Sequence, residues 1–156
     1  MIKILDIITN PNPSLRQSSK VVSQEIINSK DFQNLCADMI ETMLKKDGVG
    51  LAAPQIGKNI RVIIINTKNG PLCMLNPKIL KRSLRKEWGE EGCLSVPEYF
   101  GEVKRHKNLR YEFLDAEGNL ITDDAKGFMA RVLQHEIDHL DGILFIDKAR
   151  NLKKIK

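Results

Sequence analysis

The residues with the clearest potential for chemistry lie near the end of the chain, in the string QHEIDHLDG at 134–142. If this string is helical, His135 and His139 stand one turn apart on the same face and can bind one metal ion. Glu136 lies beside that face, where a carboxylate can move the proton of a metal-bound water without being a ligand. A solvated helix with two idle histidines would carry the same string. A third ligand decides between the two interpretations.

The chain after the second histidine lacks the third ligand of the common protease pattern. In the protease pattern H-E-x-x-H-x-x-G-x-x-H the third histidine would stand at Phe145, and no cysteine, histidine or carboxylate follows Asp147. The candidates are therefore upstream: His106, Cys93 and the carboxylates. His106 lies among the cations of 104–107, which repel a divalent ion, whereas Cys93 lies in a glycine-containing segment where a metal would hold it as thiolate. A Cys-His-His set leaves a fourth position for water, as catalytic sites do.

An amphipathic helix is predicted over about residues 31–46, where apolar residues recur at helical spacing before a glycine. Cys36, Met39 and Met43 lie on its apolar stripe and are expected to pack in the core. Cys73 lies in an apolar strand and is expected to be buried as well. These residues therefore support the fold and do no chemistry.

A second helix is predicted over 125–140, so that it carries the HExxH string. Asp123 and Asp124 offer an N-cap, and Gly142 is a stop signal. The two histidines extend the apolar face of this helix. The metal would then lie against a buried apolar wall.

The remaining periodic segments read as short strands on close turns, which is typical of antiparallel sheets. The predicted strands are 61–66, 72–75, 83–88, 109–114 and 120–122, with a hairpin turn at 115–119. The first two are expected to pair. The fold class predicted is α+β, with antiparallel sheets packed around a C-terminal metal-binding HExxH helix and an N-terminal amphipathic helix.

Two glycine-containing segments interrupt this pattern. GVGLAAPQIG at 48–57 has three glycines and one proline and is predicted to form an irregular loop. It lacks the ending of a phosphate-binding loop. Gln55 is the only side chain in its central part that can donate a hydrogen bond, and by itself it fits a structural amide as well as a functional one. EGCLSVP at 91–97 is expected to interrupt the strand before it.

Length and composition favour one catalytic domain over 1–156, since 156 residues at 42% hydrophobic suit a single core. No membrane-length apolar run is present, and the three cysteines have no framework spacing, so we expect a cytoplasmic protein with reduced thiols. The formal charge of +5 comes partly from 148–156, expected to be a frayed basic tail. Such a tail allows a weak contact with the ribosome, but no motif indicates specific nucleic-acid binding.

The segments 48–57, 91–97 and 134–142 resemble, in this order and spacing, the three signature motifs of the peptide deformylase family. The resemblance spans most of the chain. It implies a metal-dependent amide hydrolase that removes the formyl group from N-formylmethionyl peptides of newly synthesised proteins. In that reaction a metal-bound hydroxide attacks the formyl carbon.

The resemblance also implies roles for individual residues. The implied metal ligands are Cys93, His135 and His139. Glu136 would be the general base and then the general acid, while Gln55 and the backbone N–H of Leu94 would donate to the oxyanion. The implied peptide-binding residues are Gly48, Gly50 and Gly92, and the methionine pocket is placed at Phe128, Val132 and His135. We further hypothesise that Arg105 pairs with Glu91 and braces the Cys93 segment.

One divalent metal ion per chain is expected, and the family's usual Fe(II) could be replaced by Zn, Ni or Co. Two alternatives remain. A general metallopeptidase of the HExxH type is disfavoured by the missing third histidine. A non-catalytic Cys-His-His module acting as a basic RNA-binding domain is the second. No membrane partner is expected.

Overall fold

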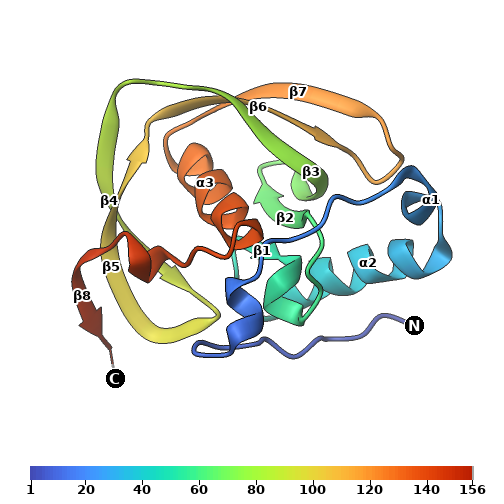
Figure 1. The fold of residues 1–156 in the computed structure, drawn as a ribbon, viewed down its shortest axis with the longest axis horizontal. Helices are drawn as coiled ribbons and strands as arrows, with labels where there is room; N and C mark the ends of the chain where they lie inside the picture. The colour runs from blue at the N-terminus through green and yellow to red at the C-terminus, as the bar shows by residue number, and fades with distance from the viewer. Residues whose placement is uncertain (156) are drawn as a thin grey trace.

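Two antiparallel sheets carry the fold in the computed structural model, which describes residues 1–155 (Figure 1). The larger sheet has the order β1-β2-β3-β6-β7, formed by Gly50–Ala52, Val62–Thr67, Gly70–Arg82, Asn108–Leu114 and Leu120–Lys126. The smaller sheet has the order β4-β5-β8, formed by Lys86–Cys93, Val96–His106 and Arg150–Lys154. The predicted α+β class with antiparallel sheets is confirmed.

The helix α2 covers one face of the larger sheet. It runs over Lys30–Lys45, close to the predicted range, and begins where the side chain of Ser29 accepts the N–H of Phe32. Its buried side chains pack against alternate residues of β2 and β3 in one apolar cluster: Phe32, Cys36, Met39 and Met43 with Val62, Ile64, Cys73 and Leu75. Cys36, Met39, Met43 and Cys73 are therefore core residues, as expected. A short helix, α1, precedes α2 at Gln24–Ile27.

The helix α3, over Phe128–Leu140, lies on the opposite face of the same sheet, between the two sheets (Figure 1). The other set of strand residues packs against it, including Ile63, Ile65, Met74 and Phe113 with Leu133, Ile137 and Leu140. Because β2 is covered on both faces, residues 62–65 are all buried. The continuous run of β-branched residues in this strand has its explanation here.

The predicted start of this helix is wrong. Asp123 and Asp124 do not cap α3 but belong to β7, where they pair with Tyr111 and Arg110 of β6. Arg110 forms an ion pair with Asp124 at 3.2 Å. The backbone turns into the helix at Gly127, whose φ is +61°. Pairing with a neighbouring strand outweighed the capping preference of the two aspartates.

The glycine-rich segment is also more regular than predicted. Gly50–Ala52 forms β1 and pairs with Ile63–Ile65 of β2, after which Ala53–Ile56 makes a single 3-10 turn. Glycine weakens a strand, but it is used where another group must approach the backbone closely. A Cβ on Gly50 would lie 2.6 Å from Oε2 of Glu136. The strand therefore forms with a glycine where the α3 carboxylate needs the space.

The second interrupting segment is likewise mostly strand. β4 continues through Glu90 to Cys93, and β5, which the sequence pattern did not reveal, pairs with β4 along nearly its whole length. Pro97 and the charged residues of β5 are not typical of a strand. The apolar and polar residues of β5 also alternate less regularly than those of a half-buried strand. Cys93 lies at the last register position, where the pairing shifts.

The basic C-terminal segment is not frayed as predicted. Arg150–Lys154 forms β8 and pairs with the edge of β5, with Tyr99 opposite Lys154 and Glu102 opposite Arg150. Its side chains are exposed, so backbone pairing with an otherwise open strand edge orders it. The guanidinium of Arg150 stacks on Trp88 at 3.6 Å from the ring centroid. Lys156, the last residue of the predicted tail, lies outside the described residues.

Within residues 1–155, no helix combines the length and the apolar character that crossing a bilayer requires.

Candidate metal centre and peptide pocket

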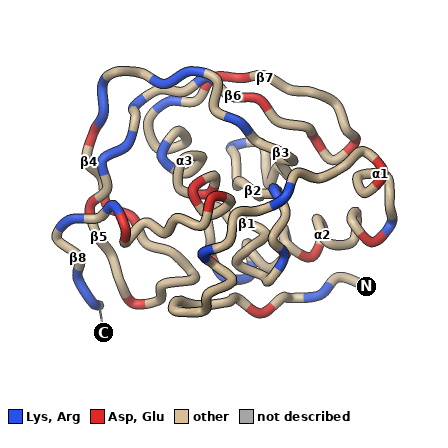
Figure 2. The backbone as a smooth tube through the Cα atoms, in the orientation of Figure 1, with Lys and Arg blue, Asp and Glu red and all other residues tan. Residues whose placement is uncertain are grey.

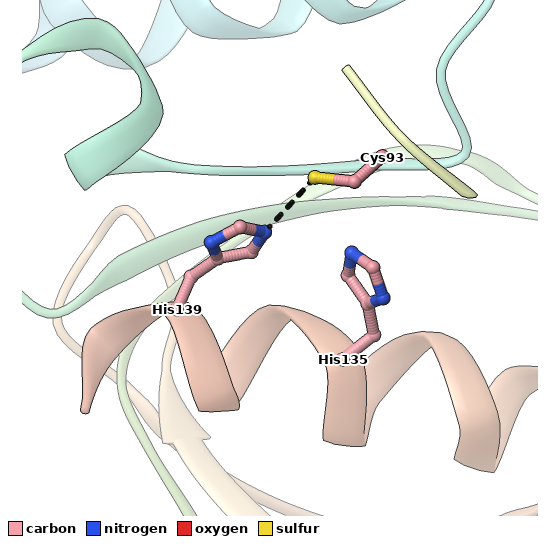
Figure 3. Close-up of side chains that lie close together, drawn as sticks. All are labelled: Cys93, His135 and His139. Atoms are coloured by element: carbon pink, nitrogen blue, oxygen red, sulfur yellow. Dashed lines mark hydrogen bonds between the residues drawn. The ribbon is translucent and has the colours of Figure 1, made fainter. Parts of the chain in front are cut away.

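The structure brings together the side chains of Cys93, His135 and His139, from β4 and α3. One ligand atom of each lies within 4.8 Å of the other two. The Sγ of Cys93 is 3.3 Å from Nε2 of His139. In Figure 3 both imidazoles rise from the same side of α3 toward the sulfur, as expected for residues four apart on a helix. The geometry thus supplies a sulfur and two nitrogens facing one point.

Glu91 orients His135. Its Oε1 is 2.8 Å from Nδ1 of that ring, which leaves Nε2 to face Cys93. Arg105 donates two hydrogen bonds of 2.9 Å to the Glu91 carboxylate, and Arg131 adds one of 2.8 Å. The hypothesised pairing of Arg105 with Glu91 is therefore present. A carboxylate behind a histidine is the usual support for a metal-binding imidazole.

The charges around this carboxylate keep it ionised. Burial alone would raise the pKa of Glu91, but the hydrogen bonds from Arg105 and His135 outweigh burial and hold that pKa below its usual range. Arg105 also forms an ion pair with Asp138, which Lys148 contacts at 3.0 Å. A buried negative charge held by two arginines is thus fixed beside the first histidine.

The two histidines differ in electrostatic surroundings. Burial lowers the pKa of His139 well below its usual value, which favours the neutral ring that binds metals. Burial also opposes the charged form of His135, but the hydrogen bond with Cys93 and the attraction of Glu136 raise its pKa overall. Within residues 1–155, Nδ1 of His139 is buried without a hydrogen-bond partner. Of the two rings, His135 is therefore the one whose surroundings favour the protonated form.

Glu136 points into the site with one oxygen unpaired. It is 4% exposed, and its Oε1 finds no hydrogen-bond partner in the described part of the chain. Burial raises the pKa of Glu136 to about 7, so this carboxyl group can exchange a proton near neutrality. An unpaired buried oxygen beside the Cys-His-His group is the kind of feature that functional sites retain.

Gln55 is held against the Cys93 segment. Its Oε1 accepts the N–H of Ala52 at 2.9 Å, while Nε2 donates to Oγ of Ser95 at 3.0 Å and lies 3.5 Å from Sγ of Cys93. The amide is therefore a fixed donor beside the sulfur. Its contact with Ser95 was not predicted, because the two residues are 40 positions apart and neither type is unusual in a loop.

A pocket of about 470 Å³ opens onto this group. The predicted peptide-binding residues all line it: Gly48, Gly50, Gly92, Phe128 and Val132. Gln55, Leu94 and Glu136 line it too, together with His135 and Cys93 but without His139. Phe128 is 68% exposed and stands at the rim. A Cβ on Gly92 would lie 2.6 Å from the ring of Phe100, so the absence of a side chain at residue 92 lets this ring pack against the backbone of β4.

The donor set fits a divalent transition metal. One thiolate and two imidazoles form a tetrahedral site with one position left for water or substrate, and they suit zinc, iron(II), nickel and cobalt. His106 does not join the group, since its Nδ1 lies 2.7 Å from the carbonyl oxygen of Ser83. The supporting roles of Arg131 and Asp138 were not predicted. The only sequence feature that could have indicated the role of Asp138 is its position inside the HExxH string.

The α+β fold and a Cys-His-His group of which Cys93 and His135 line a pocket define a candidate metallohydrolase. The family model described as polypeptide deformylase matches residues 4–155. Peptide deformylase 2 of Vibrio vulnificus is 43% identical over 155 residues, covering 97% of this chain and 89% of the relative. Peptide deformylase of Rhizobium meliloti is 44% identical over 156 residues, covering 97% and 88%.

Solved structures agree. The crystal structure of peptide deformylase from Thermotoga maritima has a TM-score of 0.90 and 38% identity, with 95% of this chain and 99% of that chain covered. The Met-Ala-Ser-bound class I type b enzyme of Acinetobacter baumannii has a TM-score of 0.90 and 36% identity, with 95% and 99% covered. The chain belongs to the polypeptide deformylase family and is an enzyme, a hydrolase of the peptide deformylase type.

Proposed function

We propose that this enzyme removes the formyl group from N-formylmethionyl peptides of newly synthesised proteins in the pocket above Cys93, His135 and His139. The observation that carries this proposal is the meeting of these three side chains with the unpaired carboxylate oxygen of Glu136 at one end of a peptide-sized pocket. Residues 1–156 would act as one catalytic domain.

Cys93, His135 and His139 would hold one divalent metal ion, with Fe(II) as the expected occupant and Zn, Ni or Co as replacements. When bound, the metal supplies Lewis acidity, lowering the pKa of water and polarising the formyl oxygen. Glu91 keeps His135 in the orientation that the site requires. Gln55, by donating toward Cys93, would stabilise the charged thiolate.

Glu136 would act as general base and then general acid. Its carboxylate takes a proton from the attacking water and delivers it to the departing amine nitrogen, which would otherwise be a poor leaving group. Its burial supports this role, because a carboxylate with a raised pKa holds a proton more readily than an exposed one. A bound cation would lower that pKa again.

Gln55 and the backbone N–H of Leu94 would meet the negative charge that develops on the formyl oxygen. Preorganised donors of this kind typically contribute a factor of roughly 100 to 1000 in rate each. The fixed position of the Gln55 amide supports this assignment, since its Oε1 is already held by the backbone of Ala52. One N–H of this amide donates to Ser95, so the N–H that faces Sγ of Cys93 is the one that would turn to the formyl oxygen.

The peptide would lie extended between β1 and β4, near Gly48, Gly50 and Gly92, with the methionine side chain against Phe128 and Val132. A strand edge receives an extended peptide through backbone hydrogen bonds. Both edges line the pocket. The Acinetobacter baumannii relative with Met-Ala-Ser bound supports a short methionine peptide as ligand.

Substitution of the proposed base tests the mechanism. For Glu136→Gln we expect kcat on formyl-Met-Ala-Ser to fall by roughly 100-fold or more, because the acid–base group is lost while the shape is kept. Elemental analysis should show metal content equal to that of the unchanged enzyme, since Glu136 is not a proposed ligand. Wild-type turnover by this variant would refute the assignment.

The bracing role of Arg105 needs a separate test. Arg105→Ala leaves Glu91 with one arginine fewer, so His135 should be held less firmly and metal affinity should fall by about 10- to 100-fold. Competition with a chromophoric chelator measures this. Arg110→Ala is the matched control, because it removes an arginine from an exposed ion pair that does not line the pocket. Equal metal retention in the two variants would contradict bracing.

Family membership as an enzyme sets aside the non-catalytic RNA-binding module, and the matches to deformylases favour that activity over a general metallopeptidase. We also propose a cytoplasmic location, which the three free cysteines support. Weak ribosome contact through 148–156 remains part of the proposal, supported by the exposed side chains of β8.

A further inference from the structure

Two cysteines meet in the core, away from the pocket. Cys36 of α2 and Cys73 of β3 are both free, and their Sγ atoms are 3.0 Å apart. They are 5% and 6% exposed. Neither lines the pocket or belongs to the Cys-His-His group. The proposed reaction therefore leaves this pair of thiols without a role.

The surroundings of the pair leave each thiol only the other as a polar neighbour among the described hydrogen bonds. The cluster around them is apolar and includes Met39, Val62 and Leu75. Two sulfurs this close have already been brought together by the packing of α2 on the sheet. Bond formation then requires the two sulfurs to approach further, to the usual S–S length of about 2.0 Å.

The two thiols differ in acidity. The hydrogen bond from Cys73 lowers the pKa of Cys36, although burial opposes this. The same hydrogen bond, together with burial, raises the pKa of Cys73. A thiol with a lowered pKa next to a second thiol is one feature of oxidisable cysteine pairs, in which one sulfur attacks and the other resolves.

We propose that Cys36 and Cys73 form an oxidisable dithiol, a site of modification by hydrogen peroxide that is separate from the catalytic centre. The Cys36 thiolate attacks one peroxide oxygen, the O–O bond breaks, and the released hydroxide takes up a proton, which leaves Cys36 as a sulfenic acid. The sulfur of Cys73 then attacks the sulfur of Cys36, the S–O bond breaks, and water leaves with the proton of Cys73. Two thiols lose two electrons, and peroxide is reduced to two waters.

The position of this bond in the chain gives it a structural consequence. The segment it closes, 36–73, contains all of 48–57 and therefore Gln55 and the glycines of the pocket. A cross-link between α2 and β3 restricts the unfolded chain on both sides of that segment. The oxidised enzyme should be more stable to heat, while the pocket, which contains neither sulfur, keeps its shape.

The first experiment maps the thiols of the full chain. Reduced protein with zinc bound is treated with a small excess of hydrogen peroxide, unfolded in an alkylating agent, and analysed by mass spectrometry with and without reductant. We expect a loss of two hydrogen atoms, a peptide in which Cys36 is joined to Cys73, and Cys93 alkylated. If Cys36 and Cys73 are instead both alkylated, or if either is joined to Cys93, the proposal is overturned.

The second experiment uses matched variants. In Cys36→Ser and Cys73→Ser the peroxide-dependent mass loss should disappear. Oxidised wild-type protein should melt several degrees above reduced protein, and neither variant should show that rise. If both variants fold poorly, the peptide map of the wild-type chain still decides. A linked wild-type protein that melts no higher than the reduced form would refute the stabilising role.

Discussion

The carboxylate of Glu136 has room in the site because residue 50 carries no side chain. A Cβ at that position would meet Oε2, Cδ and Cγ of Glu136 at 2.6, 2.9 and 2.9 Å. Glu136 is fixed on α3 and Gly50 on β1, so neither can withdraw without moving an element of the core. The absence of a side chain at Gly50 is therefore required by the carboxylate of Glu136, which we propose as the general base.

Substitution of Gly50 tests whether Glu136 requires the space that a side chain at residue 50 would occupy. For Gly50→Ala we expect kcat on a formyl-methionyl peptide to fall at least tenfold, because the added methyl displaces the proton-transferring group by a fraction of an ångström. Steady-state kinetics and a melting curve measure activity and folding side by side.

Gly48→Ala is the control for this substitution. A Cβ there would lie 3.4 Å from Leu94 and Met43, an ordinary contact, so kcat should change much less. If the two alanine variants lost activity equally, the steric argument for Gly50 would fail.

At the residue level, the sequence was enough to propose side chains of the few types that bind metal ions. The spacing of His135 and His139 is specific, and the family resemblance added Cys93, so the three could be proposed together as ligands; the structure places their side chains close to one another. Ser95 and Arg131 could not be selected. Their roles arise from partners 40 positions away along the chain, and a serine or an arginine has many ordinary uses.

At the level of elements, the N-terminal segment 8–19, called the arm from here on, contacts the segments that carry the candidate site. The N–H of Ile8 donates to the carbonyl of Gln55 at 2.7 Å, and the N–H of Asn10 donates to the carbonyl of Ser95 at 2.8 Å. Further along, Nη2 of Arg16 donates to Oδ1 of Asp147 at 3.1 Å. The arm thus contacts the segments 48–57 and 91–97, which line the pocket, and the turn that follows α3.

The ion pair of the arm predicts a pH dependence. The hydrogen bond from Arg16 lowers the pKa of Asp147 in the folded protein, so the pair stabilises the fold above the unfolded pKa of about 4 and loses its effect as pH falls through the lower folded value. Both side chains are more than a third exposed. We therefore expect Arg16→Ala to reduce the free energy of unfolding by no more than about 1 kcal/mol at pH 7.

Denaturant unfolding at several pH values tests this. The difference between Arg16→Ala and the unchanged protein should shrink toward acid pH, because both then carry a protonated Asp147. Glu91 titrates in both proteins and cancels in the comparison. A difference that stayed constant down to pH 2 would show that the pair contributes by packing alone.

The elements themselves were predictable where one pattern dominated. The helix over Lys30–Lys45 has a continuous apolar stripe, and the strands of the β6–β7 hairpin alternate around a turn. β1 and β5 were missed because their strand character comes from pairing partners and not from their own residues. The start of α3 was predicted too early for the same reason, since Asp123 and Asp124 pair with β6 and form part of β7.

At the scale of the molecule, the C-terminal strand completes the smaller sheet. Figure 2 shows basic residues along β8 and around the bends near β4, so this sheet carries positive charge on its outer edge. β8 satisfies backbone groups of β5 that would otherwise form an open edge, and Arg150 also contacts Glu102 at 3.2 Å. The basic end of the chain thus has a structural use that its composition did not reveal.

Removing this strand tests that use. A chain ending at Lys148 exposes the edge of β5, so we expect a lower melting temperature and faster aggregation on warming, with deformylation retained at low temperature. Light scattering and a peptide assay measure both effects. Lys153→Ala with Lys154→Ala is the control, since it lowers the charge and keeps the strand.

The same truncated chain also tests the proposed ribosome contact. Unchanged co-sedimentation with ribosomes would remove that part of the proposal. If only the truncated chain lost co-sedimentation, the strand would matter more than its charges.

The docking of the arm also bears on the order in which the molecule forms. Arg16 meets Gly142 and Asp147 across 126 and 131 positions of sequence, and the N–H of Ser19 donates to the carbonyl of Leu140. Contacts of such long range are costly to close and form slowly. During translation the arm cannot dock until nearly the whole chain has been made, and His135 and His139, the proposed metal ligands, are also synthesised late. Assembly of the candidate metal centre is therefore a late event, since a chain that ends before His139 lacks one of its proposed ligands.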